Sequence, residues 1–221
     1  IACINNNLKL SCLKYLYILF SSQEERDNCH LSENIINNEK IKCIILKNNF
    51  YTIIEYTNKL DDTIFCILNS DVYISDNNKL NNMVNKLFQE KNVMHVLSSL
   101  ETDGKKTWDH PKLKEIHYAI TQNMWIYKGK IDITNLNRDL VVGNIWNDLI
   151  FNKYMQKSGF RLCNDGISFS LLHLDTYILH NKPYKDPIRV ENSYVNIKNE
   201  EYCLLPDKSV IESISLDQLI K

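Results

Sequence analysis

The sequence predicts an α/β fold in which helices flank a mixed, mainly parallel central sheet. Short apolar segments typical of strands alternate along the chain with segments whose apolar residues recur at helical spacing. The run Ile64–Leu68 is the clearest strand signal, because consecutive apolar residues of these types are typical of a strand buried on both faces. A strand, helix, strand, helix, strand order up to this run indicates a parallel sheet with crossover helices.

The first third of the chain is predicted to contain two strands and two helices. Ile1–Asn6 resembles the end of a first strand that runs into a polar loop, and Leu8–Phe20 is expected to form a helix. The charged, asparagine-rich stretch Ser21–Lys40 is expected at the surface. Ile41–Leu46 is predicted as a second strand, and Asn48–Leu60 as a short helix that leads towards the central strand.

The middle of the chain continues this alternation. Val72–Ile74 has the period of a strand, and Lys79–Lys91 is predicted as a helix with one apolar face. Val93–Glu101 is expected as another strand. The polar stretch Thr102–Pro111 is interpreted as a surface loop.

The last third is predicted to add further strands and one helix. Ala119–Lys130 contains an apolar strand, and Asn147 or Asp148 is a plausible N-cap for a helix that ends at a Ser-Gly pair. Phe160–Cys163 is predicted as a short strand, and Ile167–Leu174 as a last one. The remaining residues, 177–221, are expected to wrap around the domain.

Composition restricts the class of partner and the compartment. The chain has 221 residues and a formal net charge of -1, so no basic excess is present to neutralise phosphates, and we expect no nucleic-acid partner. The seven cysteines form no C-x-x-C pair, which favours a reducing compartment over a disulfide framework. The pattern contains neither a signal peptide nor a membrane span, so the expected location is cytoplasmic.

A polar triplet, Asn69-Ser70-Asp71, ends the central strand. Open α/β sheets bind ligands at the carboxyl ends of their strands, where one carboxylate and one amide can hold a divalent cation and a sugar hydroxyl. The alternative is that the triplet only turns the chain, since these residue types also dominate turns.

Four landmarks follow one another in a fixed order along the chain. They are Asn69-Ser70-Asp71-Val72-Tyr73, Leu97-Ser98-Ser99-Leu100-Glu101, Thr121-Gln122-Asn123-Met124-Trp125-Ile126-Tyr127-Lys128-Gly129, and Trp146-Asn147-Asp148 at the start of a helix that ends Ser158-Gly159-Phe160. A strand with His173 comes after them. This order resembles a family of glycosyltransferase-like domains with the GT-A fold, found in bacteria and in large DNA viruses of algae and amoebae.

The resemblance covers most of the chain from Ile41 to about Tyr194. It implies one GT-A (Rossmann-like) domain over residues 1–221, with a nucleotide-sugar-binding half at 1–118 and an acceptor-side half at 119–221. The chain departs from the family pattern at three places. Asn123 stands where the family has an aspartate, the Asn and Arg that follow the family's aspartate are missing after Asp148, and the second histidine after His173 is replaced by Asp175.

The resemblance implies a metal-dependent glycosyltransferase that moves a sugar from a nucleotide-diphosphate sugar to a glycan or similar acceptor. Mn²⁺ or Mg²⁺ would be held by Asp71 and His173, with Asn69 and Ser70 completing the donor-binding triplet. A UDP-sugar is favoured over a GDP-sugar as the donor. Asn5 and Asn6 would contact the base at the end of the first strand, or would simply cap the next helix.

The resemblance also assigns residues to the acceptor side. Asp148 would face the acceptor sugar and could deprotonate its hydroxyl as a general base, although a helix cap is the plainer interpretation. Glu101, Asn123 and Trp125 are expected to support the acceptor site, with a place in the core favoured for Trp125. His173 could equally be a hydrogen-bonded histidine without a metal.

Two other functions stay open at this point. Asn69, Asn123 and the missing Arg after Asp148 leave open a non-catalytic domain that binds nucleotide or glycan within a larger protein. Other glycosyltransferase domains are expected to be fused to or associated with this one. An unrelated Rossmann-like enzyme is disfavoured, because the chain has no G-x-G-x-x-G or G-x-x-x-x-G-K-[ST] motif.

Overall fold

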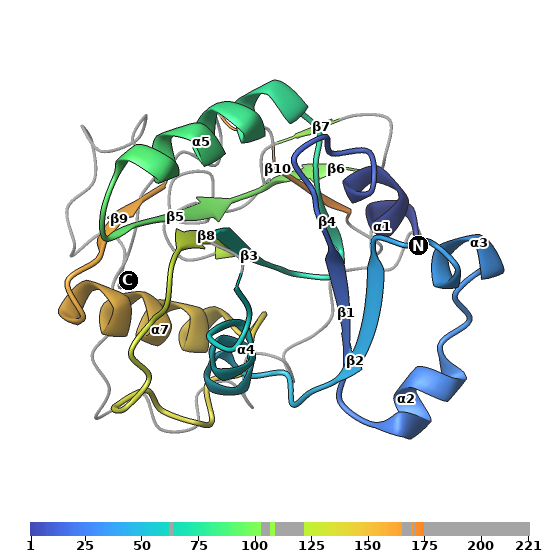
Figure 1. Cartoon of the computed structure of the whole chain (residues 1–221), viewed down its shortest axis with the longest axis horizontal. Helices are drawn as coiled ribbons and strands as arrows, with labels where there is room; N and C mark the ends of the chain where they lie inside the picture. Colours follow the sequence, from blue (N-terminus) through green and yellow to red (C-terminus); the bar gives the residue numbers. More distant parts are fainter. Residues whose placement is uncertain (62–63, 103–106, 109–121, 165–168, 170, 175–221) are drawn as a thin grey trace.

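A computed structural model describes residues 1–61, 64–102, 107–108, 122–164, 169 and 171–174. Within them the chain forms a mixed α/β structure whose central sheet has helices on both faces (Figure 1). In spatial order its strands are β3 (Ile64–Leu68), β8 (Gln122–Lys128), β5 (Val93–Ser98) and β9 (Arg161–Cys163). The helices that cover it are α5 (Asn77–Gln89) on one face, and α4 (Phe50–Thr57) and α7 (Ile145–Lys157) on the other.

The central sheet is only partly parallel, so the prediction of a mainly parallel sheet is wrong. Strand β8 pairs antiparallel with both β3 and β5, and only β5 and β9 pair in parallel. Because β3 and β5 both run opposite to β8, they run in the same direction, and their carboxyl ends lie at the same edge of the sheet. This edge carries the polar residues that follow each strand, Asn69 and Ser99.

The alternation of side chains along β8 fills both core layers. Met124 and Ile126 pack with the buried face of α5, whereas Trp125 and Tyr127 pack with α4 and α7. All four side chains are at most 1% exposed. Burying side chains of this size stabilises the fold by roughly 1.5–3 kcal/mol each, so β8 is the centre of the core.

The prediction for the first twenty residues is wrong. Ala2–Asn7 forms the short helix α1 rather than a strand, and Leu16–Phe20 forms strand β1 rather than a helix. Strand β1 pairs in parallel with β2 (Ile41–Ile45), which confirms the strand predicted there. A short apolar run fits both periods, and pairing with β2 decides in favour of the strand.

Other predictions are confirmed with changes of detail. Helix α5 buries Leu80, Met83 and Leu87 as expected, but Phe88 is 52% exposed. Strand β3 lies at one end of the sheet order, so only Ile67 is buried, and the expectation of burial on both faces is wrong. The strand predicted over 93–101 breaks at residue 99 into β5 and a second strand.

A second, smaller sheet stands beside the first. Its strands in spatial order are β4 (Val72–Ile74), β10 (Leu171–Leu174), β6 (Leu100–Thr102) and β7 (Thr107–Trp108). Two short helices, α2 (Gln23–Asn28) and α3 (Glu33–Ile36), lie between β1 and β2 in the chain. Strand β8 of the proposed acceptor half lies between β3 and β5 of the proposed donor half, so both halves build one sheet.

No helix in the described ranges combines the length and apolar character needed to cross a membrane. The predicted division at residue 118 and the single domain over 1–221 stay predictions.

Candidate functional site

Asp71 and His173 lie in contact although they are far apart in the sequence. The His173 Nε2 atom is 3.2 Å from the Asp71 Oδ2 atom. Strand β10 places the histidine there by pairing antiparallel with β4, and the Leu174 amide donates a hydrogen bond to the Asp71 carbonyl oxygen at 2.8 Å. Their side chains are 28% and 49% exposed, so a ligand can reach both from solvent.

The backbone of Glu101 lies beside His173. Strand β6 pairs in parallel with β10, and Glu101 is the register partner of His173. The Asp175 noted in the sequence lies outside the described residues, as does the predicted wrapping segment 177–221. The structure therefore brings three of the predicted site residues to one end of the smaller sheet.

A series of side-chain hydrogen bonds links Asn69 of the triplet to the ends of the neighbouring strands. Asn69 Nδ2 donates to Asn123 Oδ1 at 2.7 Å, and the Asn69 amide donates to the Asn123 carbonyl oxygen at 3.1 Å. Asn123 Nδ2 in turn donates to Ser99 Oγ at 2.6 Å. Ser70 is exposed in the turn after Asn69. The side chains that follow β3 and β5 are thus joined through the first residues of β8.

Asp148 is a buried carboxyl group next to this chain. It lies in the first turn of α7, which begins at Ile145, so it is not the N-cap, and its side chain is 2% exposed. Asp148 Oδ1 accepts a hydrogen bond from the Gly143 amide at 3.3 Å. Burial raises the pKa of Asp148 well above the ordinary value for an aspartate, and the Gly143 hydrogen bond opposes this shift only in part.

Gly143 brings the Asp148 turn against the triplet. Its φ is +82°, and a Cβ atom built on it would lie 3.4 Å from Asn69 Oδ1. Gly143 therefore has a left-handed backbone conformation and lies directly beside the side-chain amide group of Asn69. Gly143 therefore connects the Asp148 carboxyl group with Asn69. Asp71 follows Asn69 by two residues, so it belongs to the same region.

Gly143→Ala and Gly129→Ala form a matched pair of variants. Both glycines have a φ of +82°, but a Cβ at Gly129 meets nothing within 4 Å. We expect each variant to lose about 1–2 kcal/mol of unfolding free energy through backbone strain, measured by urea denaturation. Only Gly143→Ala should also weaken ligand binding at the candidate site, because its methyl group meets Asn69. Equal ligand affinity in both variants would contradict this placement.

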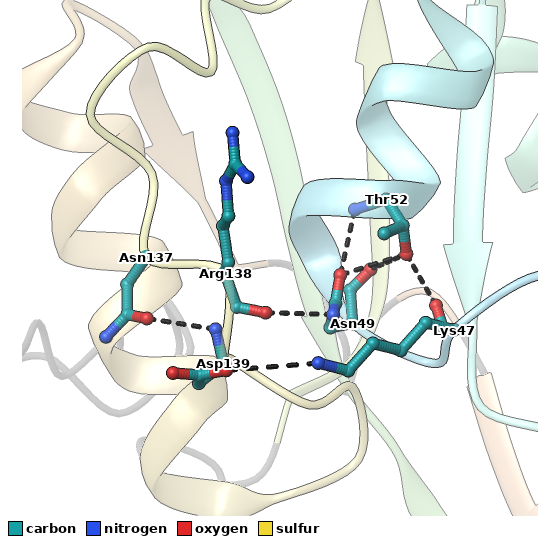
Figure 2. Close-up of polar contacts among 6 residues, drawn as sticks. All are labelled: Lys47, Asn49, Thr52, Asn137, Arg138 and Asp139. Carbon is teal, nitrogen blue, oxygen red and sulfur yellow. Dashed lines mark hydrogen bonds and ion pairs between the residues drawn. The ribbon is translucent and has the colours of Figure 1, made fainter.

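The connection that carries Gly143 is anchored on the start of α4 (Figure 2). Asn49 is 1% exposed, its Oδ1 accepts from the Thr52 amide at 2.8 Å, and its Nδ2 donates to the Arg138 carbonyl oxygen at 2.8 Å. The Phe50 amide donates to the Leu140 carbonyl oxygen at 2.9 Å. One asparagine therefore caps α4 and holds the connection that leads to Asp148.

Asn49→Ala is expected to lower the unfolding free energy by roughly 1–3 kcal/mol, because it removes a helix cap and the part-buried hydrogen bond to the Arg138 carbonyl oxygen. Urea denaturation followed by circular dichroism measures this loss. Asn48→Ala is the matched control, since Asn48 is exposed and its side chain reaches the Val142 carbonyl oxygen only at 3.5 Å. Similar losses in both variants would show that the anchor does not depend on Asn49.

Trp125 is buried behind the site and belongs to the core. It is 0% exposed, its ring lies edge-on to Phe50 with centroids 5.0 Å apart, and its Nε1 donates to Asn152 Oδ1 at 2.9 Å. Asn152 Nδ2 donates to Gln122 Oε1 at 3.1 Å. The burial favours the core interpretation of Trp125 and leaves its ring no surface for a sugar. Sequence reasoning missed Asn152, which lies four residues after Asp148 on the buried side of α7.

Helix α1 packs against the start of β4. The buried Asn7 donates from Nδ2 to the Val72 carbonyl oxygen at 3.1 Å and accepts from the Ile74 amide at 3.0 Å. Asn5 is exposed, and Asn6 Oδ1 accepts a hydrogen bond from Lys9 at 3.1 Å. Because these residues do not end a strand, the reason for assigning Asn5 and Asn6 to the nucleotide base is lost.

Cys3 is a further neighbour of the site that the sequence did not indicate. Burial, followed by the negative charge of Asp71, raises the pKa of the Cys3 thiol to about 11. The thiol therefore stays protonated at neutral pH and acts as a small apolar side chain beside Asp71. No sequence signal marks this neighbour, since only the packing of α1 on β4 brings it there.

In the part of the chain that the structure describes, no group of three or more histidine, cysteine, aspartate or glutamate side chains is arranged to hold a metal ion. Asp71 and His173 offer one oxygen and one nitrogen ligand, a set that suits Mn²⁺ when a phosphate ligand supplies the other oxygens. The pair therefore fits a cation that binds together with a nucleotide.

Comparisons of the chain with protein-family models, with curated proteins and with solved structures found no match.

Proposed function

We propose that the chain is a metal-dependent glycosyltransferase that transfers a sugar from a nucleotide-diphosphate sugar, with UDP favoured over GDP, to a glycan or similar acceptor. The observation that carries the proposal is the 3.2 Å contact between Asp71 and His173. The resemblance implies these two residues as the metal ligands, and their contact gives a cation one oxygen and one nitrogen ligand in the same place.

Asp71 and His173 would hold Mn²⁺ or Mg²⁺, and the cation supplies Lewis-acid stabilisation of the diphosphate leaving group when it is bound. With only two protein ligands, the affinity for metal should be low until the nucleotide adds its phosphate oxygens. Asn69 lies beside this pair in the chain, and its amide suits a hydrogen bond to a ribose or sugar hydroxyl. Exposed Ser70 would lie at the rim of the same site.

Asp148 is the proposed general base towards the acceptor hydroxyl. A base works best when its pKa lies near the operating pH, and burial shifts the pKa of Asp148 in that direction. Acceptor binding has to open access to this carboxyl group, because its side chain is 2% exposed. Glu101, beside His173 in the sheet, and Asn123, bonded to Asn69, would support the two substrates.

Calorimetric titration of UDP and GDP, with and without Mn²⁺ or Mg²⁺, tests the proposal on the native chain. We expect saturable binding of one nucleotide that requires the metal, followed by slow hydrolysis of the matching sugar nucleotide. Absence of nucleotide binding under every metal condition would overturn the proposal. The cytoplasmic location and the fused or associated glycosyltransferase domains stay predictions.

A non-catalytic domain that binds nucleotide or glycan is the second candidate function. Two observations favour it. The side chains of Asn69 and Asn123 are hydrogen-bonded to each other rather than open to a substrate, and the proposed base Asp148 is shielded from solvent. Metal-dependent nucleotide binding without turnover of any matching sugar nucleotide, even with added acceptors, would decide for this candidate.

A further inference from the structure

A groove that shares no residue with the candidate site lies over β1 and β2. It has a volume of about 580 Å³, and its lining includes Tyr15, Tyr17, Tyr56, Arg26 and Lys42. These residues come from β1 and the segment before it, from β2, and from helices α2 and α4. We call this feature the tyrosine groove; its volume is within the range of sites for small ligands.

The three tyrosine rings form an edge-to-face row. The ring centroids of Tyr15 and Tyr17 are 6.2 Å apart with planes at 69°, and those of Tyr17 and Tyr56 are 5.9 Å apart with planes at 71°. Because neighbouring rings are turned strongly against each other, a flat group can stack on one ring at a time. This geometry favours a ligand with a single planar aromatic group over a strand of stacked bases.

The charge of the groove is positive. Lys14 and Lys42 hold their Nζ atoms 5.4 Å and 5.3 Å from the centroid of the Tyr15 ring. Arg26 and Lys42 are both exposed, and among the described residues neither forms an ion pair with a carboxylate. Two such cations beside aromatic rings complement an anion, and a phosphate can accept two parallel hydrogen bonds from a guanidinium.

We propose that the tyrosine groove binds a nucleoside monophosphate, with its base against a tyrosine ring and its phosphate at Arg26 and Lys42. The groove is separate from the proposed metal site, so this binding needs neither Asp71 nor a divalent cation. A molecule of this class has one planar base, one anionic group and a size that the groove accommodates.

Isothermal titration of the native chain with AMP and UMP in the presence of EDTA tests the proposal. We expect saturable binding of at least one nucleotide, with inorganic phosphate and the free nucleoside each at least tenfold weaker. The double variant Arg26→Ala/Lys42→Ala should lose at least tenfold in affinity, whereas Tyr56→Leu should reduce the preference for nucleotide over phosphate. Lys86→Ala, which removes an exposed lysine on α5, and Asp71→Ala should bind as the native chain does.

Four results would overturn the proposal. The first is no saturable binding of either nucleotide, and the second is unchanged affinity in the double variant. The third is a ten-nucleotide single strand that binds more tightly than the mononucleotides, because it would assign the groove to nucleic acid. The fourth is loss of binding in Asp71→Ala, because it would assign the nucleotide to the metal site instead.

Discussion

Asp71→Ala is expected to weaken Mn²⁺-dependent binding of UDP by about 100-fold or more. Replacing groups that only support a metal ligand already costs about 10–100-fold in metal affinity, and Asp71 is proposed as a ligand itself. It is also the only negatively charged group of the Asp71–His173 pair. Without it, His173 alone has to hold the cation against its hydration shell. Calorimetry with UDP at saturating Mn²⁺ measures the loss.

Asp61→Ala is the matched control for this experiment, because Asp61 is an exposed carboxylate that precedes β3. We expect it to bind nucleotide as the native chain does. His173→Ala should weaken metal-dependent UDP binding as Asp71→Ala does, since both side chains are proposed to bind the same cation. If Asp71→Ala retained metal-dependent UDP binding, the cation site would lie elsewhere.

Asp148→Asn is expected to lower the transfer rate by about 10²–10⁴-fold while raising the stability of the fold. The rate falls because an amide cannot accept the proton of the acceptor hydroxyl. The stability rises because the ionised carboxylate is buried at 2% exposure, whereas an amide of the same shape needs no charge in that place. A residue kept for structure alone would not combine these two effects.

The gain in stability should depend on pH. The folded state raises the pKa of Asp148, so it binds this proton more tightly than the unfolded chain does. The native protein therefore loses stability as the pH rises above about 4, the pKa of an aspartate in the unfolded chain. The loss ends once the pH has passed the raised pKa of the folded state. Below about pH 4, Asp148→Asn should have no stability advantage over the native protein. The difference in unfolding free energy should grow between the two pKa values and be constant above the higher one.

Urea denaturation across this pH range, with initial rates of sugar transfer, measures both effects. Asp139→Asn is the control, because the Asp139 side chain is 89% exposed and its ion pair with Lys47 is 3.9 Å long. It should change stability by less than about 0.5 kcal/mol and leave the rate unchanged. A full rate in Asp148→Asn would show that another group deprotonates the acceptor.

Several elements follow from local sequence alone. The apolar spacing of Leu80, Met83 and Leu87 is sufficient to define α5, and the run Ile64–Leu68 is sufficient to define a strand followed by a polar turn. In α5 the buried residues recur at helical spacing, whereas in β3 a short apolar run that ends at polar residues is long enough for a strand and too short for a helix of ordinary length. Asp71 was predicted as a site residue because it follows the strand run, whereas Asp148 was assigned a role only by the family resemblance.

The sequence by itself therefore determined an α/β chain with polar residues where its strands end. Only the tertiary structure decided the direction of β8, the exchange of helix and strand in the first twenty residues, and the neighbours of each site residue. Short apolar runs such as Leu16–Phe20 fit both the helical and the strand period. Hydrogen bonding to β2 stabilises the strand here. The contact of Asp71 with His173 depends on β10 lying against β4, which no local pattern of residues specifies.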